Sequence, residues 1–145
     1  MNIKVLEATL LSKEEYETNR DIIKHADSCW WLRSPGISSN FASFVDVDDT
    51  AYDCGDGLYY DFFAVRPALI LESENLKIGS QITYAEQTFT VLRDGLALCD
   101  KSIHQMAFRE DWESKDANIY EASDIKKWVD SWFSRNGDIA ETIEE

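Results

Sequence analysis

The sequence predicts an α+β fold built on an antiparallel sheet with two main helices. Many short segments have the alternation, or the β-branched and aromatic composition, of strands. Helical signals occur in two places, one near each end of the chain. The connections between the expected strands are mostly too short for the crossovers of a parallel sheet. We expect one domain over residues 1–145, because this length suffices for one real core and not for two.

Local signals define the first elements. Residues 3–10 ("IKVLEATL") have the composition of a strand. Ser12 precedes Glu15 by three residues, which is the spacing of a capping box and predicts a helix over residues 13–24.

A tryptophan pair and an acidic segment come next. Residues 29–34 ("CWWLRS") are strand-like, and the Ser-Pro-Gly turn at 34–36 ends that strand. Residues 41–47 ("FASFVDV") alternate between two faces and predict a half-buried strand. An acidic loop over residues 46–57 follows.

The middle of the chain predicts a run of strands. Pro67 divides the first part into one long strand with a break or two short ones. A hairpin and an Asp-Gly turn at 94–95 connect the later strands. The expected strands cover residues 58–65, 66–72, 81–85, 88–93 and 96–101.

The C-terminal part predicts an amphipathic helix. Residues 102–122 are expected to form a loop with a short helix, and Ser123 caps the helix that follows. Apolar side chains recur in that helix with helical spacing, at Ile125, Trp128, Val129, Trp132 and Phe133. Gly137 ends the helix, and a flexible acidic tail is expected from about residue 138 to residue 145.

The charge balance favours a basic partner. The chain has 28 acidic and 14 basic side chains, a net charge of −14. Such a field repels nucleic acid and anionic membranes, so neither is expected as a direct partner. Residues 46–61 hold six Asp and no basic residue.

Sequence features also bear on compartment and cofactors. The N terminus lacks the basic segment and cleavage site of a signal peptide, so we expect an intracellular protein. No apolar run approaches the roughly 20 residues of a membrane helix. Cys29, Cys54 and Cys99 are widely spaced, which predicts reduced thiols rather than a zinc site or a redox dithiol. No cofactor is expected.

Three stretches, "CWWLRSPG", "FASFV" and "VRPALIL", together resemble a bacterial and phage domain family of unknown function. Members of that family carry WWLRSPG and GVRPAL motifs, and Ala64 stands where they usually have Gly. The arrangement is also similar to that of formylglycine-generating-enzyme domains. The resemblance implies a C-type-lectin-like fold and a bacterial cytoplasmic location. It does not carry over the activity of those enzymes, because their pair of copper-binding cysteines has no match here.

The order of the motifs implies a circular permutation. In the family, segments like "IGSQITYAEQTFTVL" and "SDIKKWVDSWF" precede the "LLSKEEY" and WWLRSPG parts, whereas here they follow them. The family's usual termini would be joined through "LESENLK". The N terminus should then lie beside the end of the C-terminal helix, since permutation requires neighbouring termini.

The resemblance also implies structural roles for five residues. The tryptophans would pack between helix and sheet, and the arginines would bind backbone carbonyls or a buried carboxylate. These residues are Trp30, Trp128, Trp132, Arg33 and Arg66.

The acidic segment is the candidate binding surface, because Tyr among carboxylates suits the recognition of basic protein surfaces. Its candidate residues are Asp46, Asp48, Asp49, Tyr52, Asp53, Asp56, Tyr59 and Tyr60. Two alternatives stay open: a solvated, disordered loop, and a calcium loop. Asp46 and Asp48 match the first ligand spacing of a calcium loop, but its Gly at the sixth place and Glu at the twelfth are missing.

These features predict a non-catalytic module that binds a basic protein. One form is a phage or mobile-element inhibitor, similar in role to an anti-CRISPR protein, that occupies the basic channel of a nucleic-acid-binding enzyme. One alternative is a carbohydrate- or small-ligand-binding domain, which needs an exposed tryptophan such as Trp31 or Trp112. Another is an enzyme, which needs a cavity joining Cys99 or His104 to carboxylates.

Overall fold

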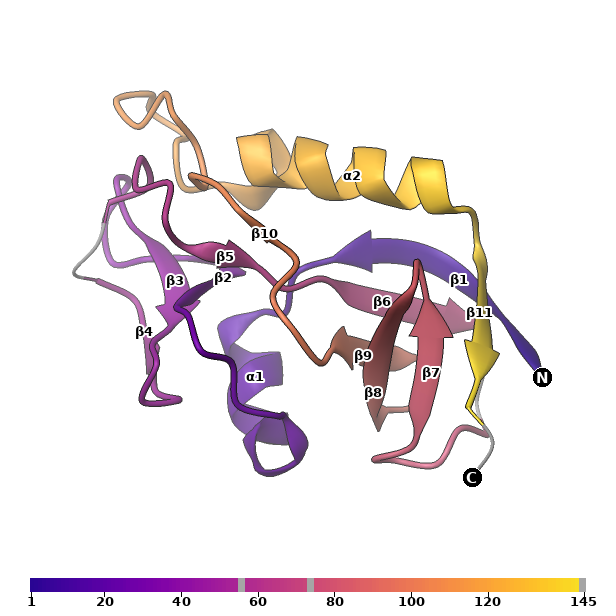
Figure 1. The fold of residues 1–145 in the computed structure, drawn as a ribbon. Coiled ribbons are helices and arrows are strands. Elements are labelled where there is room, and N and C mark those ends of the chain that lie inside the picture. Colours follow the sequence, from indigo (N-terminus) through magenta and orange to yellow (C-terminus); the bar gives the residue numbers. More distant parts are fainter. Residues whose placement is uncertain (55–56, 73–74, 144–145) are drawn as a thin grey trace.

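The computed structural model describes residues 1–54, 57–72 and 75–143. Across these residues the chain has an α+β fold, in which a closed six-stranded barrel adjoins a five-stranded sheet (Figure 1). The barrel strands are β1 (Asn2–Thr9), β6 (Ala68–Glu72), β7 (Gln81–Tyr84), β8 (Gln87–Arg93), β9 (Leu96–Cys99) and β11 (Ile139–Thr142). The small sheet consists of β2 (Trp30–Pro35), β3 (Ala42–Val45), β4 (Ala51–Tyr52), β5 (Ala64–Val65) and β10 (His104–Gln105). The α-helices are α1 (Lys13–Asn19) and α2 (Asp124–Asn136).

The barrel closes through its first and last strands. Its order is β1, β11, β7, β8, β9, β6 and back to β1, and every neighbouring pair is antiparallel. Closure removes the unpaired strand edges that an open sheet would expose. Val5, Leu69 and Phe89 are buried in its interior.

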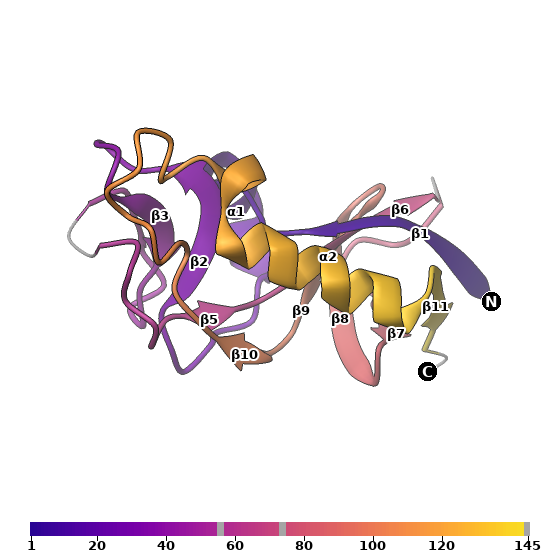
Figure 2. The same cartoon turned by 90° about the horizontal axis from the view of Figure 1, so that it is seen from above.

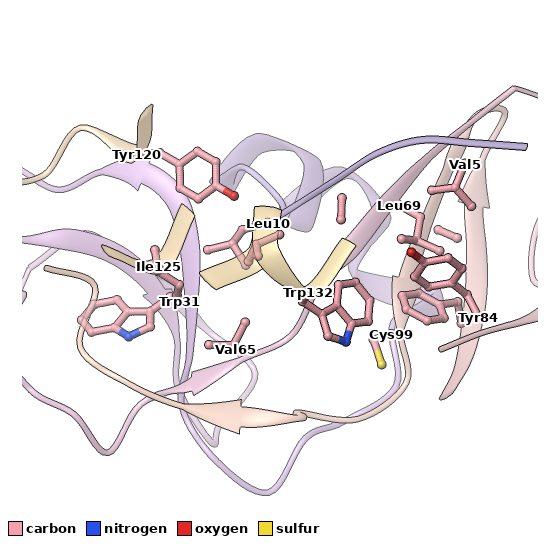
Figure 3. Close-up of a cluster of buried hydrophobic side chains, with 14 of the residues drawn as sticks. Val5, Leu10, Trp31, Val65, Leu69, Tyr84, Cys99, Tyr120, Ile125 and Trp132 are labelled. Atoms are coloured by element: carbon pink, nitrogen blue, oxygen red, sulfur yellow. The ribbon is translucent and has the colours of Figure 1, made fainter. Parts of the chain in front are cut away.

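Helix α2 lies along both units, with its first turn near the small sheet and its last turn beside β11 (Figures 1 and 2). Ser123 caps it by accepting a hydrogen bond from the Lys126 N–H at 3.1 Å. The buried face includes Ile125 and Trp132, and the Trp132 ring lies 5.4 Å from that of Tyr84 in the barrel (Figure 3). The helix therefore covers one continuous core that extends from the small sheet into the barrel.

The small sheet is buried on both faces. Trp31 packs against Phe63 and Phe108, with ring centroids 4.7 and 5.6 Å away. Trp30 points to the opposite face and meets Tyr16 of α1 edge-on at 5.4 Å. Both tryptophans are fully buried because each face has its own apolar cluster.

The Ser-Pro-Gly turn ends β2 where two strands pass close to it. A Cβ on Gly36 would lie 2.5 Å from the Asp53 carbonyl oxygen and 2.6 Å from the Phe41 Cβ. The same approach allows Gly36 N–H to donate to the Phe41 carbonyl at 2.8 Å. Position 36 therefore requires glycine, because there is no room for a Cβ atom.

Several expectations from the sequence were wrong in detail. The first helix ends at Asn19 and continues as a 3-10 helix over Arg20–Ile22. Within residues 58–65, only Ala64–Val65 form a strand. The strand expected to be half-buried, β3, is buried at all four positions, because both faces of the small sheet are covered.

The acidic tail expected from about residue 138 is replaced over Ile139–Thr142 by β11. This strand pairs with both β1 and β7, and Ala140 is fully buried. The N-terminal amine of Met1 donates to Thr142 Oγ1 at 3.1 Å. The N terminus thus lies beside the strand that follows α2, the proximity that a circular permutation requires; the permutation itself stays a prediction.

Candidate functional site

Arg66, expected from the resemblance to be structural, is 1% exposed. Its Nε donates to the Cys99 carbonyl at 2.7 Å, and its Nη2 donates to the carbonyls of Lys24 (2.7 Å) and Asp100 (3.3 Å). The guanidinium also lies 4.8 Å from the centre of the Trp30 ring, in a cation–π contact. Arg66 therefore ties the segment before β2 to the segment after β9 through backbone oxygens.

Arg33 joins β2 to α1. Its Nη1 donates to the Leu10 carbonyl at 2.7 Å and to Glu15 Oε1 at 2.5 Å. Arg93 reaches the other oxygen of Glu15 at 3.2 Å. Burial raises the pKa of Glu15. The hydrogen bonds that its carboxylate accepts from Arg33 and from the Ser12 backbone N–H outweigh that effect and hold the pKa below its ordinary value.

The tryptophans differ in exposure. Trp30 and Trp132 are buried, whereas Trp128 is half-buried and stacks on His104, with centroids 4.5 Å apart and planes 4° apart. Of the two candidates for a sugar platform, Trp31 is fully buried and Trp112 is 39% exposed.

Residues 46–50 of the acidic segment form the hairpin turn between β3 and β4. Asp46 Oδ1 accepts from the Val47 N–H at 2.7 Å, and Asp48 Oδ1 accepts from the Thr50 N–H at 2.9 Å. Tyr52 donates its hydroxyl to Asp48 Oδ2 at 3.0 Å. The hydrogen bonds from Thr50 and Tyr52 hold the pKa of Asp48 below its ordinary value.

The remaining acids of this hairpin also have partners within the protein. Asp49 Oδ1 pairs with His25 Nδ1 at 2.9 Å, and the Asp49 carbonyl accepts the Tyr16 hydroxyl at 2.6 Å. Asp53 lies 3.7 Å from Lys13 Nζ. We call Asp46, Asp48, Asp49 and Asp53 the hairpin acids; Asp56 lies outside the described residues.

A second group of side chains forms a row of neighbouring rings, which we call the aromatic face: exposed Tyr59, Phe62 and Trp112, and half-buried Tyr60. Ring centroids are 5.5 Å apart for Trp112 and Tyr59, 4.7 Å for Tyr59 and Tyr60, and 5.2 Å for Tyr60 and Phe62. Tyr59 is 47% exposed and Phe62 54% exposed. A contiguous row in which three of four rings are exposed is the kind of apolar surface that marks interaction sites.

Buried anchors hold this row on the surface. Leu58 and Phe63 point into the core on either side of the exposed rings. The loop that carries Trp112 is joined to this segment where the Arg109 N–H donates to the Leu58 carbonyl at 3.2 Å, next to buried Phe108. Two loops distant in sequence are thus fixed side by side.

Carboxylates border the aromatic face. Asp61 lies between Tyr60 and Phe62 in the chain, and with Glu110 and Asp124 it lines a cavity of about 480 Å³ that none of the four rings lines. Asp111, next to Trp112 in the chain, has a side chain that is 73% exposed. Acidic groups and apolar rings therefore meet at one surface.

The structure separates the two halves of the expected binding surface. Asp46, Asp48 and Asp49 lie in the turn between β3 and β4, where Asp49 pairs with His25. Asp53 lies beyond β4, beside Gly36 and near Lys13, whereas Tyr59 contacts Trp112. Sequence reasoning missed Phe62 and left Trp112 only as a sugar candidate. The available signal was that Trp112 has acidic neighbours on both sides, which favour a solvent-exposed position.

The side chains named for an enzyme do not form a nucleophilic pair. His104 lines a cavity that also includes Asp27 and Asp100, but Cys99 does not line it. Cys99 is fully buried, and burial raises the pKa of its thiol to about 11. This thiol is therefore protonated at neutral pH and hidden from substrates.

The part of the chain that the structure describes has neither a metal-binding cluster nor a membrane-spanning helix. No group of three or more His, Cys, Asp or Glu side chains there could hold a metal ion. Among the same residues, none of the helices has the length and apolarity to cross a bilayer.

Comparison of the chain with protein-family models, curated proteins and solved structures finds no match.

Proposed function

We propose that this protein is a non-catalytic binding module that holds a basic protein partner on its aromatic face. The observation that carries the proposal is the row of contacting, mutually tilted rings formed by Tyr59, Tyr60, Phe62 and Trp112, of which all but Tyr60 are exposed, with Asp61 between two of them in the chain. Tyrosine and tryptophan contribute large, rigid contact areas and are enriched among the residues that dominate binding energy.

The charge of the protein favours a basic partner. A net charge of −14 attracts positive surfaces from a distance and speeds their encounter. The carboxylates beside the aromatic face are placed to meet Lys or Arg side chains after that encounter. We assign the hairpin acids to long-range attraction only, because each already has a partner inside the protein.

A narrower form of the proposal is an inhibitor from a phage or mobile element, similar in role to an anti-CRISPR protein. It would cover the basic channel of a nucleic-acid-binding host enzyme in the bacterial cytoplasm, since such channels are lined with Lys and Arg. The acidity of the chain supports this form.

A C-type-lectin-like scaffold is the proposed framework for this surface. Support for it comes from two helices, antiparallel pairing of the first strand with the last, and a second sheet whose loops carry the aromatic face. The motifs around Trp31 and Arg66 are the other support.

The test is capture of a partner by tagged protein from a bacterial lysate, identification of that partner by mass spectrometry, and titration with the purified partner. The face variant combines Tyr59→Ser with Trp112→Ser. Its control is Ile78→Ser, because Ile78 is 58% exposed and lies in the barrel region away from the face. A hairpin variant changes Asp46, Asp48, Asp49 and Asp53 to Asn, which preserves the turn geometry.

We expect the face variant to weaken binding by about 2 kcal/mol or more, the size of a hot-spot effect, and Ile78→Ser to leave it unchanged. The hairpin variant should slow association with little effect on dissociation. Binding that is equal in the face variant and the wild type would refute the assignment. Affinity that does not fall between low and moderate salt would refute a basic partner.

A carbohydrate ligand is the second candidate, because Trp112 is exposed and lies 5.5 Å from Tyr59. Soluble oligosaccharides would then quench Trp fluorescence in the wild type and not in Trp112→Ser. This outcome is independent of salt and so differs from that expected for a basic protein.

A further inference from the structure

Both histidines of the chain line one cavity, although they are far apart in sequence. The cavity has a volume of about 1010 Å³ and lies between residues 24–28 and residues 100–105. Ser28 Oγ donates to Ser102 Oγ at 3.4 Å, where the two walls meet. The volume is sufficient for a small organic ligand.

Two side chains of this cavity, Lys101 and His104, have no hydrogen-bond partner among the residues that the structure describes. Lys101 is exposed and forms no ion pair with any residue in the described ranges. His104 is also exposed; its backbone pairs with Val65 in β5, and its ring stacks on Trp128. Hydroxyl groups of Ser28 and Ser102 stand beside them. Ammonium, imidazole and hydroxyl donors together suit an oxyanion such as phosphate.

The carboxylates of the cavity are already engaged or point outward. Asp100 accepts hydrogen bonds from Lys24 and Gln81, each at 2.9 Å, and from the hydroxyl of Thr90. Asp27 has a fully exposed side chain, 3.7 Å from His25. Neither carboxylate therefore forms an ion pair with Lys101 or His104.

A buried positive charge lies behind the walls. Arg66 binds the backbone carbonyls of Lys24, Cys99 and Asp100, and it forms no ion pair with any described residue. Burial lowers its pKa only to about 10, so it is charged at neutral pH. A charge in this position, screened little by solvent, favours an anion in the cavity against the opposing charge of neighbouring Asp100.

One ring is placed to receive a planar group. His104 lines the cavity, and Trp128, which does not line it, supports one face of the imidazole in a nearly parallel stack. The other face of the imidazole is therefore available to a ligand ring, which would extend the stack.

We infer that this cavity binds a small molecule that carries a phosphate group beside a planar ring, of the class of the nucleoside monophosphates. Lys101 and the serine hydroxyls bind the phosphate, and His104 stacks on the ring. The site shares no residue with the aromatic face, so the inference goes beyond the proposed protein-binding function and can fail or hold independently of it.

The test uses the full chain and follows the ring Cε1–H signals of its two histidines by NMR during titration with AMP, and separately with adenosine. Lys101→Gln removes the proposed phosphate contact. Lys115→Gln is the matched control, because it removes the same charge from an exposed lysine that does not line the cavity.

We expect AMP to shift the His104 signal saturably and adenosine to shift it much less. Lys101→Gln should weaken AMP binding by about tenfold or more, as for other hydrogen bonds to charged groups, and Lys115→Gln should leave it nearly unchanged. The inference is overturned if AMP causes no saturable shift, if adenosine binds as well as AMP, or if the two lysine variants lose affinity equally.

Discussion

Arg33 and Arg66 flank the small sheet and use their charges differently. Arg33 is half-buried and meets the carboxylate of Glu15, whereas Arg66 is fully buried and binds only backbone oxygens among the described residues. A guanidinium with five donors can hold several carbonyls of separate segments at once, which an apolar side chain cannot do. The resemblance pointed to both residues, but only the structure could tell which segments each arginine joins.

At the same scale, Cys99 makes the free energy of unfolding depend on pH in the alkaline range. Burial raises the pKa of this thiol from 9.0 to about 11, so above pH 9 the unfolded chain loses the proton before the folded chain does. The unfolded state then binds fewer protons, and the free energy of unfolding falls as pH rises. We expect Cys99 to account for a loss of about 1 kcal/mol between pH 8 and pH 10.

Urea unfolding of the wild type and Cys99→Ala at these two pH values measures this contribution. The wild type should lose about 1 kcal/mol more than the variant, because both share every other titrating group. An equal pH dependence in the two proteins would contradict the assignment.

At the scale of elements, β11 is expected to be essential for stability. It pairs with β1 on one side and β7 on the other, so a chain that ends at Asp138 opens the barrel at two interfaces. We expect a loss of at least about 4 kcal/mol in the free energy of unfolding, beyond most single-site effects. Circular dichroism during urea unfolding measures it, with a chain that ends at Ile143 as the control. Equal midpoints for the two truncated chains would show that β11 is dispensable.

The same element shows where sequence reasoning failed. Caps and periodicity made α2 predictable, since Ser123 and the apolar spacing act within one helix. β11 has one buried residue, Ala140, and lies in a segment, 138–145, with four acidic and no basic residues, so no local pattern distinguishes it from a tail. Strands of two residues, such as β4 and β10, are too short to show any period.

The aromatic face could not be predicted from the sequence for a related reason. The segment "LYYDFF" has the composition of a strand, but its backbone turns, and the Tyr60 N–H donates to the Gly57 carbonyl at 3.2 Å. Leu58 and Phe63 point inward while Tyr59 and Phe62 stay exposed, a choice that depends on packing from distant segments. The sequence indicates the chemical character of each side chain, but it does not indicate which distant residues contact Tyr59.

At the scale of the whole molecule, neighbouring ends should permit the order of segments to be changed. Met1 and Thr142 are linked by hydrogen bonds in both directions, with the Thr142 N–H donating to the Met1 carbonyl at 3.0 Å. We expect a permuted chain, opened in "LESENLK" and joined from residue 145 to residue 1 by a short glycine linker, to fold with a similar melting temperature.

Circular dichroism and thermal melting of this permuted chain test the expectation. A matched permutant opened within β8, between Val91 and Leu92, serves as the control, because both residues are buried in the barrel and should not tolerate new ends. Failure of the first permutant to fold, or equal stability of the two, would contradict the expectation.

Barrel closure also has a consequence for synthesis on the ribosome. β1 emerges early and can find β6 once the middle of the chain has been made, but its other edge waits for β11. Until Thr142 leaves the exit tunnel, that edge of β1 has unpaired backbone groups. Unpaired strand edges can pair with strands of other chains, which leads to misassembly. We therefore expect the synthesis of β11 to be the step that removes the open edge of β1.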